Sequence, residues 1–195
     1  MSHLLLVRHG QSEWNAVGRW QGQANPPLSD LGRKQATVAA DSLQFFDAIC
    51  ASPLLRAFDT AEIIADILGI APVLIDNDLM ERDAGPWQGL TRPEIRKNWP
   101  NHLETGRRPE GFETDKSLLK RVRKALTYFT SFVGASGQGL VITHGGVIGA
   151  LESAYGEPWE RIGNLSGRWI DLLDGSMTIG HRVDLLTDTT TPELF

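Results

Sequence analysis

Apolar and polar positions follow two alternating patterns along the chain. Short apolar runs are typical of buried strands, and apolar residues recurring every three or four positions predict amphipathic helices. The strand-like runs are residues 4–7, 46–52, 71–75 and 139–144. The helical segments are residues 29–43, 52–69, 113–133 and a stretch starting near Val147. Strands that alternate with helices predict an α/β fold with a largely parallel central sheet.

Capping signals mark the ends of these predicted helices. Ser29 is placed to cap the first helix. Ser52, followed by Pro53 at a position that tolerates proline, is expected to cap the second helix, and Gly69 to end it.

Two segments depart from the alternation. Residues 82–111 are rich in Gly, Pro and Trp, and we expect an excursion that contains a short helix at 93–99. Residues 167–186 predict a β-hairpin with Asp174-Gly175 as its turn.

The composition is that of a soluble globular protein. With 195 residues, of which 41% are hydrophobic and 22% charged, the chain is expected to form one domain over 1–195. The formal charge of −5 argues against nucleic acid or an anionic membrane as a partner. The single cysteine, Cys50, stands in an apolar run and is expected to be packed rather than reactive. Neither a signal peptide nor a membrane-spanning stretch is recognisable, so we expect a cytoplasmic location.

Polar side chains follow the predicted strands where each strand ends. They are Arg8, His9, Arg56, Glu81 and His144. The carboxyl ends of parallel strands face one crevice, so these groups are expected to converge. Arginine binds phosphate oxygens through a fixed fork of donors, and a neutral histidine can attack phosphorus. A carboxyl group can protonate the leaving oxygen. The set therefore indicates phosphoryl transfer.

Each of these side chains also has an ordinary structural explanation. Arg8-His9 could be a surface pair, Arg56 could pair with an acid on its own helix, and Glu81 could belong to a charged loop. The sequence contains no GxxxxGK loop, no HExxH pair and no aspartate cluster, so a metal-dependent hydrolase is the weaker interpretation.

Five motifs resemble the histidine phosphatase superfamily, whose best-known branch is the cofactor-dependent phosphoglycerate mutases. In chain order they are LLLVRHGQSEWN, WQGQANPPLSDLGRKQA, ASPLLRAFDTAEIIA, LMERDAGPWQGLT and LVITHGGVIGAL. The resemblance implies a three-layer α/β/α sandwich with a mostly parallel sheet, and an enzyme that needs no metal or other cofactor.

The resemblance also implies residue roles. His9 is the nucleophile that carries the phosphoryl group, and Glu81 is the acid and then the base. Arg8, Arg56 and His144 stabilise the phosphate charge. The other implied phosphate-pocket positions are Asn15, Gln21, Gly22 and Gly145.

The short branch of the superfamily is the better match, which favours a phosphomonoesterase acting on a small phosphorylated metabolite. The span between Glu81 and His144 lacks the insertion of glycolytic mutases, and ERDAGPWQG resembles phosphatase-like members. A mutase, or a non-catalytic member that binds a phosphorylated ligand, remains the alternative. Arg107 and Arg108 could imitate the basic substrate clamp of mutases, although we favour a solvated loop pair.

The segment EPWERIGNLSGRWIDL resembles actinobacterial members that dephosphorylate glucosyl-3-phosphoglycerate and related phosphoesters. The matching positions are Asn164, Ser166 and Trp169, which hint at the substrate class. The tryptophans at 14, 20 and 87 fall inside the pocket motifs and could shape its walls. The sequence leaves a homodimer open.

Overall fold

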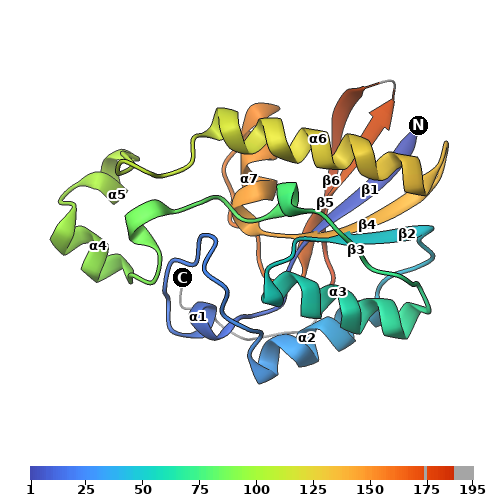
Figure 1. Ribbon diagram of the computed structural model, residues 1–195, viewed down its shortest axis with the longest axis horizontal. Helices are drawn as coiled ribbons and strands as arrows, with labels where there is room; N and C mark the ends of the chain where they lie inside the picture. Colours follow the sequence, from blue (N-terminus) through green and yellow to red (C-terminus); the bar gives the residue numbers. More distant parts are fainter. Residues whose placement is uncertain (174, 187–195) are drawn as a thin grey trace.

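A six-stranded sheet forms the centre of the protein in the computed structural model, which describes residues 1–173 and 175–186 (Figure 1). The strands, in spatial order, are β3 (Leu74–Ile75), β2 (Ala48–Ala51), β4 (Gln138–Thr143), β1 (Ser2–Arg8), β5 (Ser166–Leu173) and β6 (Ser176–Asp184). The first four pair in parallel, whereas β5 and β6 form an antiparallel hairpin against β1. The predicted, mostly parallel α/β sheet is confirmed.

Helices cover both faces of this sheet. The helices α6 (Asp115–Val133) and α7 (Gly145–Ala154) lie on one side, and α2 (Asp30–Asp41) and α3 (Leu55–Leu68) lie on the other (Figure 1). Successive side chains of a strand point to opposite faces. Leu4 and Leu6 of β1 therefore join the core under α6 and α7, and Leu5 and Val7 join the core over α2 and α3. The protein is the expected three-layer sandwich.

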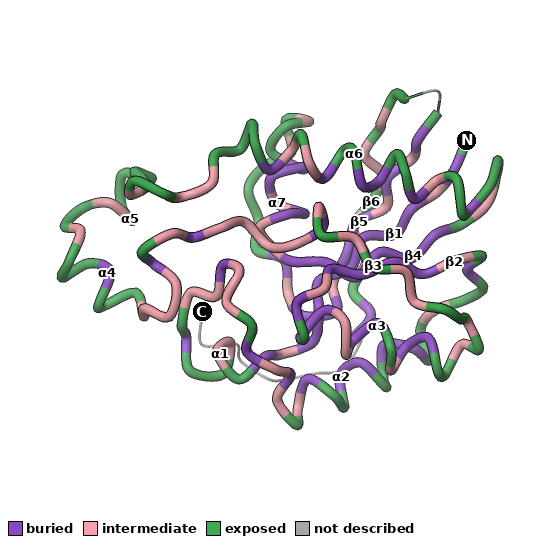
Figure 2. Tube along the Cα trace, viewed as in Figure 1, coloured by how far each residue is buried: buried purple, intermediate pink, exposed green. Residues whose placement is uncertain are grey.

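The central strands are the most deeply buried part of the chain, as Figure 2 shows. A strand that is buried on both faces reads as a continuous apolar run, which is why residues 4–7 were recognisable. The rigid core holds the carboxyl ends of β1, β2 and β4 at one edge of the sheet.

The helix ends agree with the sequence in part. Ser29 caps α2, with its Oγ accepting from the Gly32 amide at 3.1 Å, and Gly69 ends α3 in the left-handed region at φ 68°. The predicted cap at Ser52 is wrong, because α3 begins only at Leu55, with Leu54 as its N-cap. The Ser52 hydroxyl contacts a histidine and accepts from the Leu54 amide before the helix. The helix α7 begins at Gly145, two residues before its expected start.

The excursion forms a small separate core beyond the sheet edge. Its elements are the 3-10 turn η2 (Gly85–Trp87) and the helices α4 (Arg92–Asn98) and α5 (His102–Thr105), and the 3-10 turn η1 (Asn77–Leu79) precedes it, with Leu79 in the core under α6 and α7. In Figure 1, α4 and α5 lie at the far left, away from the sheet. Trp87 and Ile95 are fully buried in this core. The predicted helix at 93–99 is confirmed within one residue, but α5 and α1 (Glu13–Ala16) were not predicted.

The predicted C-terminal hairpin is confirmed as β5 and β6. Asp174 of its expected turn lies outside the described residues, and Gly175 has the left-handed φ of 78° that a turn glycine supplies. The single domain expected over 1–195 stays a prediction, and residues 187–195 also lie outside the described part. Within the described residues, the helices are too short or too polar to cross a lipid bilayer.

Candidate active site

The polar groups that follow the strands meet around one cavity of about 670 Å³. Arg8 ends β1, His9 follows it, and Arg56 stands in the first turn of α3. These three side chains line the cavity together with Glu81. The convergence follows from the parallel pairing of β1, β2 and β4, which brings their carboxyl ends to one edge.

His9 is held as a neutral imidazole with its Nε2 atom toward Arg56. Its ring is 3% exposed, and Nδ1 lies 2.6 Å from the Gly10 carbonyl oxygen. A carbonyl only accepts, so the proton resides on Nδ1. Nε2 accepts from Nε of Arg56 at 3.2 Å. Burial, followed by the charges of Arg56 and Arg8, holds the pKa of His9 well below its ordinary value. Nε2 is therefore unprotonated at neutral pH, with its lone pair directed at Nε of Arg56.

Arg56 is a fully buried cation anchored by main-chain oxygens. Its two terminal nitrogens donate to the carbonyls of Gly22 at 2.9 Å and Ala24 at 2.8 Å. Burial lowers the pKa of Arg56 to about 10, so the group stays charged at pH 7. Arg8 donates to the Ile162 carbonyl at 2.6 Å. Two guanidinium groups next to a neutral imidazole make an anion receptor with a nucleophile inside it.

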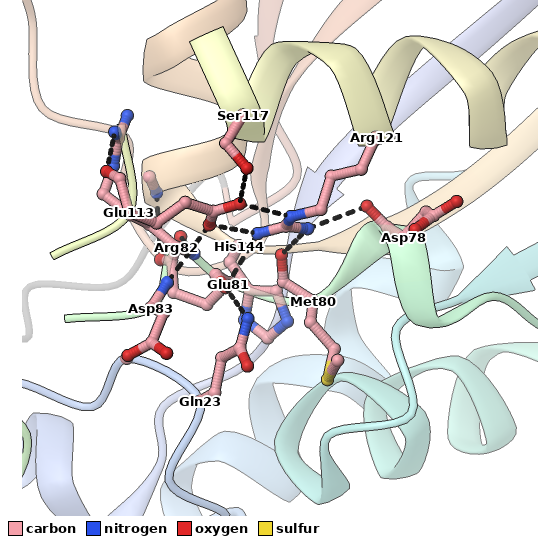
Figure 3. A network of polar contacts seen from close by, with 12 residues as sticks. Gln23, Asp78, Met80, Glu81, Arg82, Asp83, Glu113, Ser117, Arg121 and His144 are labelled. Carbon is pink, nitrogen blue, oxygen red and sulfur yellow. Dashed lines mark hydrogen bonds and ion pairs between the residues drawn. The ribbon is translucent and has the colours of Figure 1, made fainter. Parts of the chain in front are cut away.

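The Glu81 carboxylate is fixed by two backbone amides. Oε1 accepts from the Arg82 amide at 2.7 Å, and Oε2 accepts from the Gly146 amide at 3.0 Å. A Cβ atom on Gly146 would lie 2.3 Å from Oε1, so the carboxylate occupies space that only a glycine leaves free. Figure 3 shows Glu81 within a wider network of polar contacts.

His144 lies behind His9 and is not among the described residues that line the cavity. The two imidazole rings meet edge to face, with their centroids 5.1 Å apart. Nε2 of His144 lies 2.8 Å from Oγ of Ser52, whereas its buried Nδ1 has no hydrogen-bond partner in the described part of the chain. Burial, then the charges of Arg56 and His9, hold the pKa of His144 well below its ordinary value.

The remaining residues expected around a phosphate all line the cavity. They are Asn15, Gln21, Gly22 and Gly145. Ser12, the N-cap of α1, holds the first two: its Oγ lies 2.7 Å from Oε1 of Gln21, and its amide donates to Oδ1 of Asn15 at 3.2 Å.

The outer wall of the cavity carries an aromatic cluster with a guanidinium over it. The guanidinium carbon of Arg108 lies 5.3 Å from the ring centroids of Trp87 and Phe112 and 5.9 Å from that of Trp20. Arg107 and Arg108 are both exposed, as expected of a solvated loop pair, but Arg108 also lies over these rings and lines the cavity, whereas Arg107 is outside the described lining. Of the tryptophans expected in the pocket walls, only Trp20 lines the cavity among the described residues.

The residues that hinted at the substrate class lie outside the described cavity lining. Asn164 is buried and donates to the His9 carbonyl at 2.7 Å, so it supports the nucleophile from behind. Trp169 stacks on Phe46, with centroids 6.2 Å apart, in the core over α2 and α3. Sequence reasoning missed this role of Asn164, as well as Ser52 and Gly146; only the double glycine after His144 was a visible signal.

A neutral histidine between two arginines, with a carboxylate across the cavity, defines a site for phosphoryl transfer. The family model of the histidine phosphatase superfamily (branch 1) matches residues 4–173. The chain belongs to this superfamily, as its motifs indicated.

Two curated relatives and one solved structure share much of the chain. It is 37% identical over 190 residues to glucosyl-3-phosphoglycerate phosphatase of Mycolicibacterium vanbaalenii, covering 87% of this chain and 83% of the relative. It is 41% identical over 102 residues to phosphoserine phosphatase 1 of Hydrogenobacter thermophilus, covering 51% and 48% of the two chains. The structure of a mycobacterial glucosyl-3-phosphoglycerate phosphatase complexed with VO3 superposes with a TM-score of 0.81 at 30% identity, covering 91% and 96%. The expected actinobacterial relationship is confirmed.

Proposed function

We propose that this protein hydrolyses small phosphomonoesters through a phosphohistidine formed on Nε2 of His9. The observation that supports this most directly is the hydrogen bond from Nδ1 of His9 to the Gly10 carbonyl, because it leaves a neutral Nε2 atom beside two guanidinium groups. The relatives named as phosphatases support hydrolysis.

In the first step, the phosphate of the substrate accepts hydrogen bonds from Arg8 and Arg56. Nε2 of His9 forms a bond to phosphorus while the bond from phosphorus to the ester oxygen breaks. Glu81 gives its proton to that oxygen, so an alcohol leaves and the phosphoryl group stays on the ring. The amides of Asn15 and Gln21 and the backbone of Gly22 and Gly145 surround the phosphate oxygens.

In the second step, water attacks the phosphohistidine. The Glu81 carboxylate takes the proton of the water, the bond between nitrogen and phosphorus breaks, and its electron pair returns to Nε2 of His9. Inorganic phosphate leaves. Because Arg8 and Arg56 stabilise the charge that develops on the phosphoryl oxygens, the reaction needs no metal ion. His144 lies behind His9, and its neutral ring packs edge to face against the His9 ring.

A mutase would run the same first step and then pass the phosphoryl group to a second hydroxyl. A non-catalytic member would need neither the nucleophile nor the acid, and both lie in the cavity here. The cytoplasmic location, the single domain over 1–195, the absence of nucleic-acid or membrane partners and the homodimer that the sequence leaves open stay predictions.

The test is p-nitrophenyl phosphate hydrolysis with and without EDTA, beside His9→Ala and an assay for conversion of phosphoglycerate isomers. We expect hydrolysis that EDTA leaves unchanged and that His9→Ala abolishes. Activity that disappears with EDTA, or that survives His9→Ala, would refute the mechanism. Fast isomer conversion with negligible hydrolysis would assign the mutase instead.

A further inference from the structure

The segment around Glu81 has little regular structure of its own. It runs from the two-residue strand β3 through η1 to η2, and much of it is held by local turns and by side chains from other elements. We propose that the partly buried ion pair of Arg121 and Glu113 is a positioning device that sets the Glu81 carboxyl group against the leaving oxygen. This inference rests on the proposed function, in which Glu81 is the proton donor.

Arg121 binds the backbone of this segment at three points. From α6, one terminal nitrogen donates to the carbonyls of Asp78 at 2.8 Å and Met80 at 2.6 Å. The other donates to the carbonyl of Glu81 itself at 3.0 Å (Figure 3). One rigid guanidinium thus fixes the main chain that leads into Glu81.

Glu113 fixes both this guanidinium and the chain that follows Glu81. Its Oε1 and Oε2 atoms accept from Nε and a terminal nitrogen of Arg121 at 2.8 Å and 2.7 Å. Oε2 also accepts from the Asp83 amide at 3.2 Å, and the Glu113 amide donates to the Asp83 carbonyl at 2.9 Å. The Glu81 backbone is therefore held on both sides by one ion pair.

A role in stability explains this pair poorly. The side chains of Arg121 and Glu113 are 16% and 11% exposed. Burial raises the pKa of Glu113, but the hydrogen bonds and charge of Arg121 outweigh it and keep the pKa below its ordinary value. Removing two charges from water costs about as much as their attraction returns, so buried pairs seldom stabilise a fold more than apolar side chains would. A positioning role explains the pair better, because three carbonyls and one carboxylate accept from all the N–H donors of the Arg121 guanidinium.

Neither Arg121 nor Glu113 is among the described residues that line the cavity, so both act through Glu81. The Glu81 carboxylate accepts hydrogen bonds from the Arg82 amide, in the segment that Arg121 and Glu113 fix, and from the Gly146 amide, on α7. A shift of the segment relative to α7 separates these two donors and moves the acid. Misplacing a catalytic group by about 1 Å can cost about 10²-fold in rate.

The test compares leaving groups in the double variant Arg121→Met/Glu113→Gln and in Arg121→Lys. The double variant removes both buried charges together, because Arg121→Met alone would leave the Glu113 carboxylate buried without its partner. The value of kcat/KM is measured for p-nitrophenyl phosphate, whose leaving group departs without a proton, and for propyl phosphate, whose alkoxide needs one. The value of kcat/KM reports the steps up to phosphoryl transfer to His9 and is unaffected by the later hydrolysis of the phosphohistidine.

We expect kcat/KM for propyl phosphate to fall about 10²-fold, and that for p-nitrophenyl phosphate to fall less than about fivefold. The Lys variant should fall in between, because one ammonium group cannot bind all three carbonyls and the carboxylate. Thermal melting confirms that each variant is folded.

The matched control is Arg182→Met/Glu152→Gln. Arg182 on β6 also forms a fork with a buried glutamate, at 2.8 Å and 2.6 Å, and binds the Glu160 carbonyl at 3.0 Å, so it holds a part of the chain other than the Glu81 segment. We expect its two kcat/KM values to change by the same factor. An equal change for both substrates in the Arg121 variants, or the same bias in the control, overturns the positioning role. A failure of the proposed function is seen separately, because His9→Ala would then remain active.

Discussion

Replacing Gly146 by alanine should lower the activity of this protein while changing its stability little. Gly146 is the second residue of α7, where the backbone is helical and accepts any L-residue. An added Cβ atom would lie 2.3 Å from Oε1, 2.9 Å from Cδ and 3.1 Å from Oε2 of Glu81. The helix backbone cannot yield, whereas the carboxylate ends a flexible side chain. Glu81 therefore moves, and the fold does not.

Gly146→Ala has two effects of opposite sign on the free energy of unfolding. Alanine is favoured over glycine in a helix by up to about 1 kcal/mol, which offsets part of the hydrogen bond lost between the Gly146 amide and Glu81. We expect a change in the free energy of unfolding within about 1 kcal/mol. A displaced general acid costs about 10² to 10⁴-fold, so kcat/KM for an alkyl phosphate should fall by at least about 10²-fold. The value for p-nitrophenyl phosphate should fall far less.

The assay pairs urea unfolding with kcat/KM for both substrates. Gly149→Ala is the control, because it lies one turn further along α7 and its added Cβ atom meets no atom within 4 Å. We expect this control to leave the ratio of the two kcat/KM values unchanged. If Gly146→Ala lowered both values equally, or left the alkyl phosphate unaffected, the assignment of Glu81 as the proton donor would be refuted.

Three further predictions concern pH, specificity and the thiol. His9 and His144 are buried in the neutral form, so below a pH of about 6.5 the unfolded chain binds protons that the folded chain does not. In urea unfolding, the free energy of unfolding should therefore fall by about 1.4 kcal/mol per pH unit for each histidine. A flat profile between pH of about 6.5 and about 5 would contradict this. Arg108→Met should raise KM about tenfold for a phosphomonoester with a carboxylate on its leaving group, because a hydrogen bond to a charged group contributes about 1.5–3 kcal/mol. The KM for p-nitrophenyl phosphate should stay unchanged. Arg107→Met is the control, and an equal rise in KM for both substrates would count against a role of Arg108 in specificity. Burial raises the pKa of Cys50 to about 12, so a thiol reagent at pH 8 should label it only in denaturant; labelling of the folded protein would disprove its packing.

The sequence predicts this fold well where hydrophobic burial alone decides the structure. The continuous apolar run of β1 and the helical spacing of α6 both follow from which faces are covered. The predictions fail where local signals compete with tertiary contacts. Ser52 has the side chain of a helix cap, yet its hydroxyl contacts His144, so α3 begins later. The short helices α1 and α5 have too few residues for any periodicity to show.

The convergence of the candidate site residues was predictable because topology and side-chain chemistry point the same way. Arg8, His9 and Arg56 follow strands that pair in parallel, so their convergence required only the order of the elements. The contact of Arg108 with the cavity wall was not predictable, because Arg108 is an exposed loop residue and only the fold brings Trp20, Trp87 and Phe112 beneath it.

The supports of the site were not predictable, because most of them act on main-chain atoms. Arg56 donates to two carbonyls and Arg121 to three, while Asn164 holds the carbonyl of His9. Every residue has a carbonyl group, so a sequence carries no sign of which carbonyl will accept from a distant guanidinium. Arg121 also stands in a helix whose polar residues are ordinarily solvated. A sequence can therefore show which side chains are candidates for the reaction, but the placement that the proposed role of Glu81 requires depends on contacts that only the folded backbone defines.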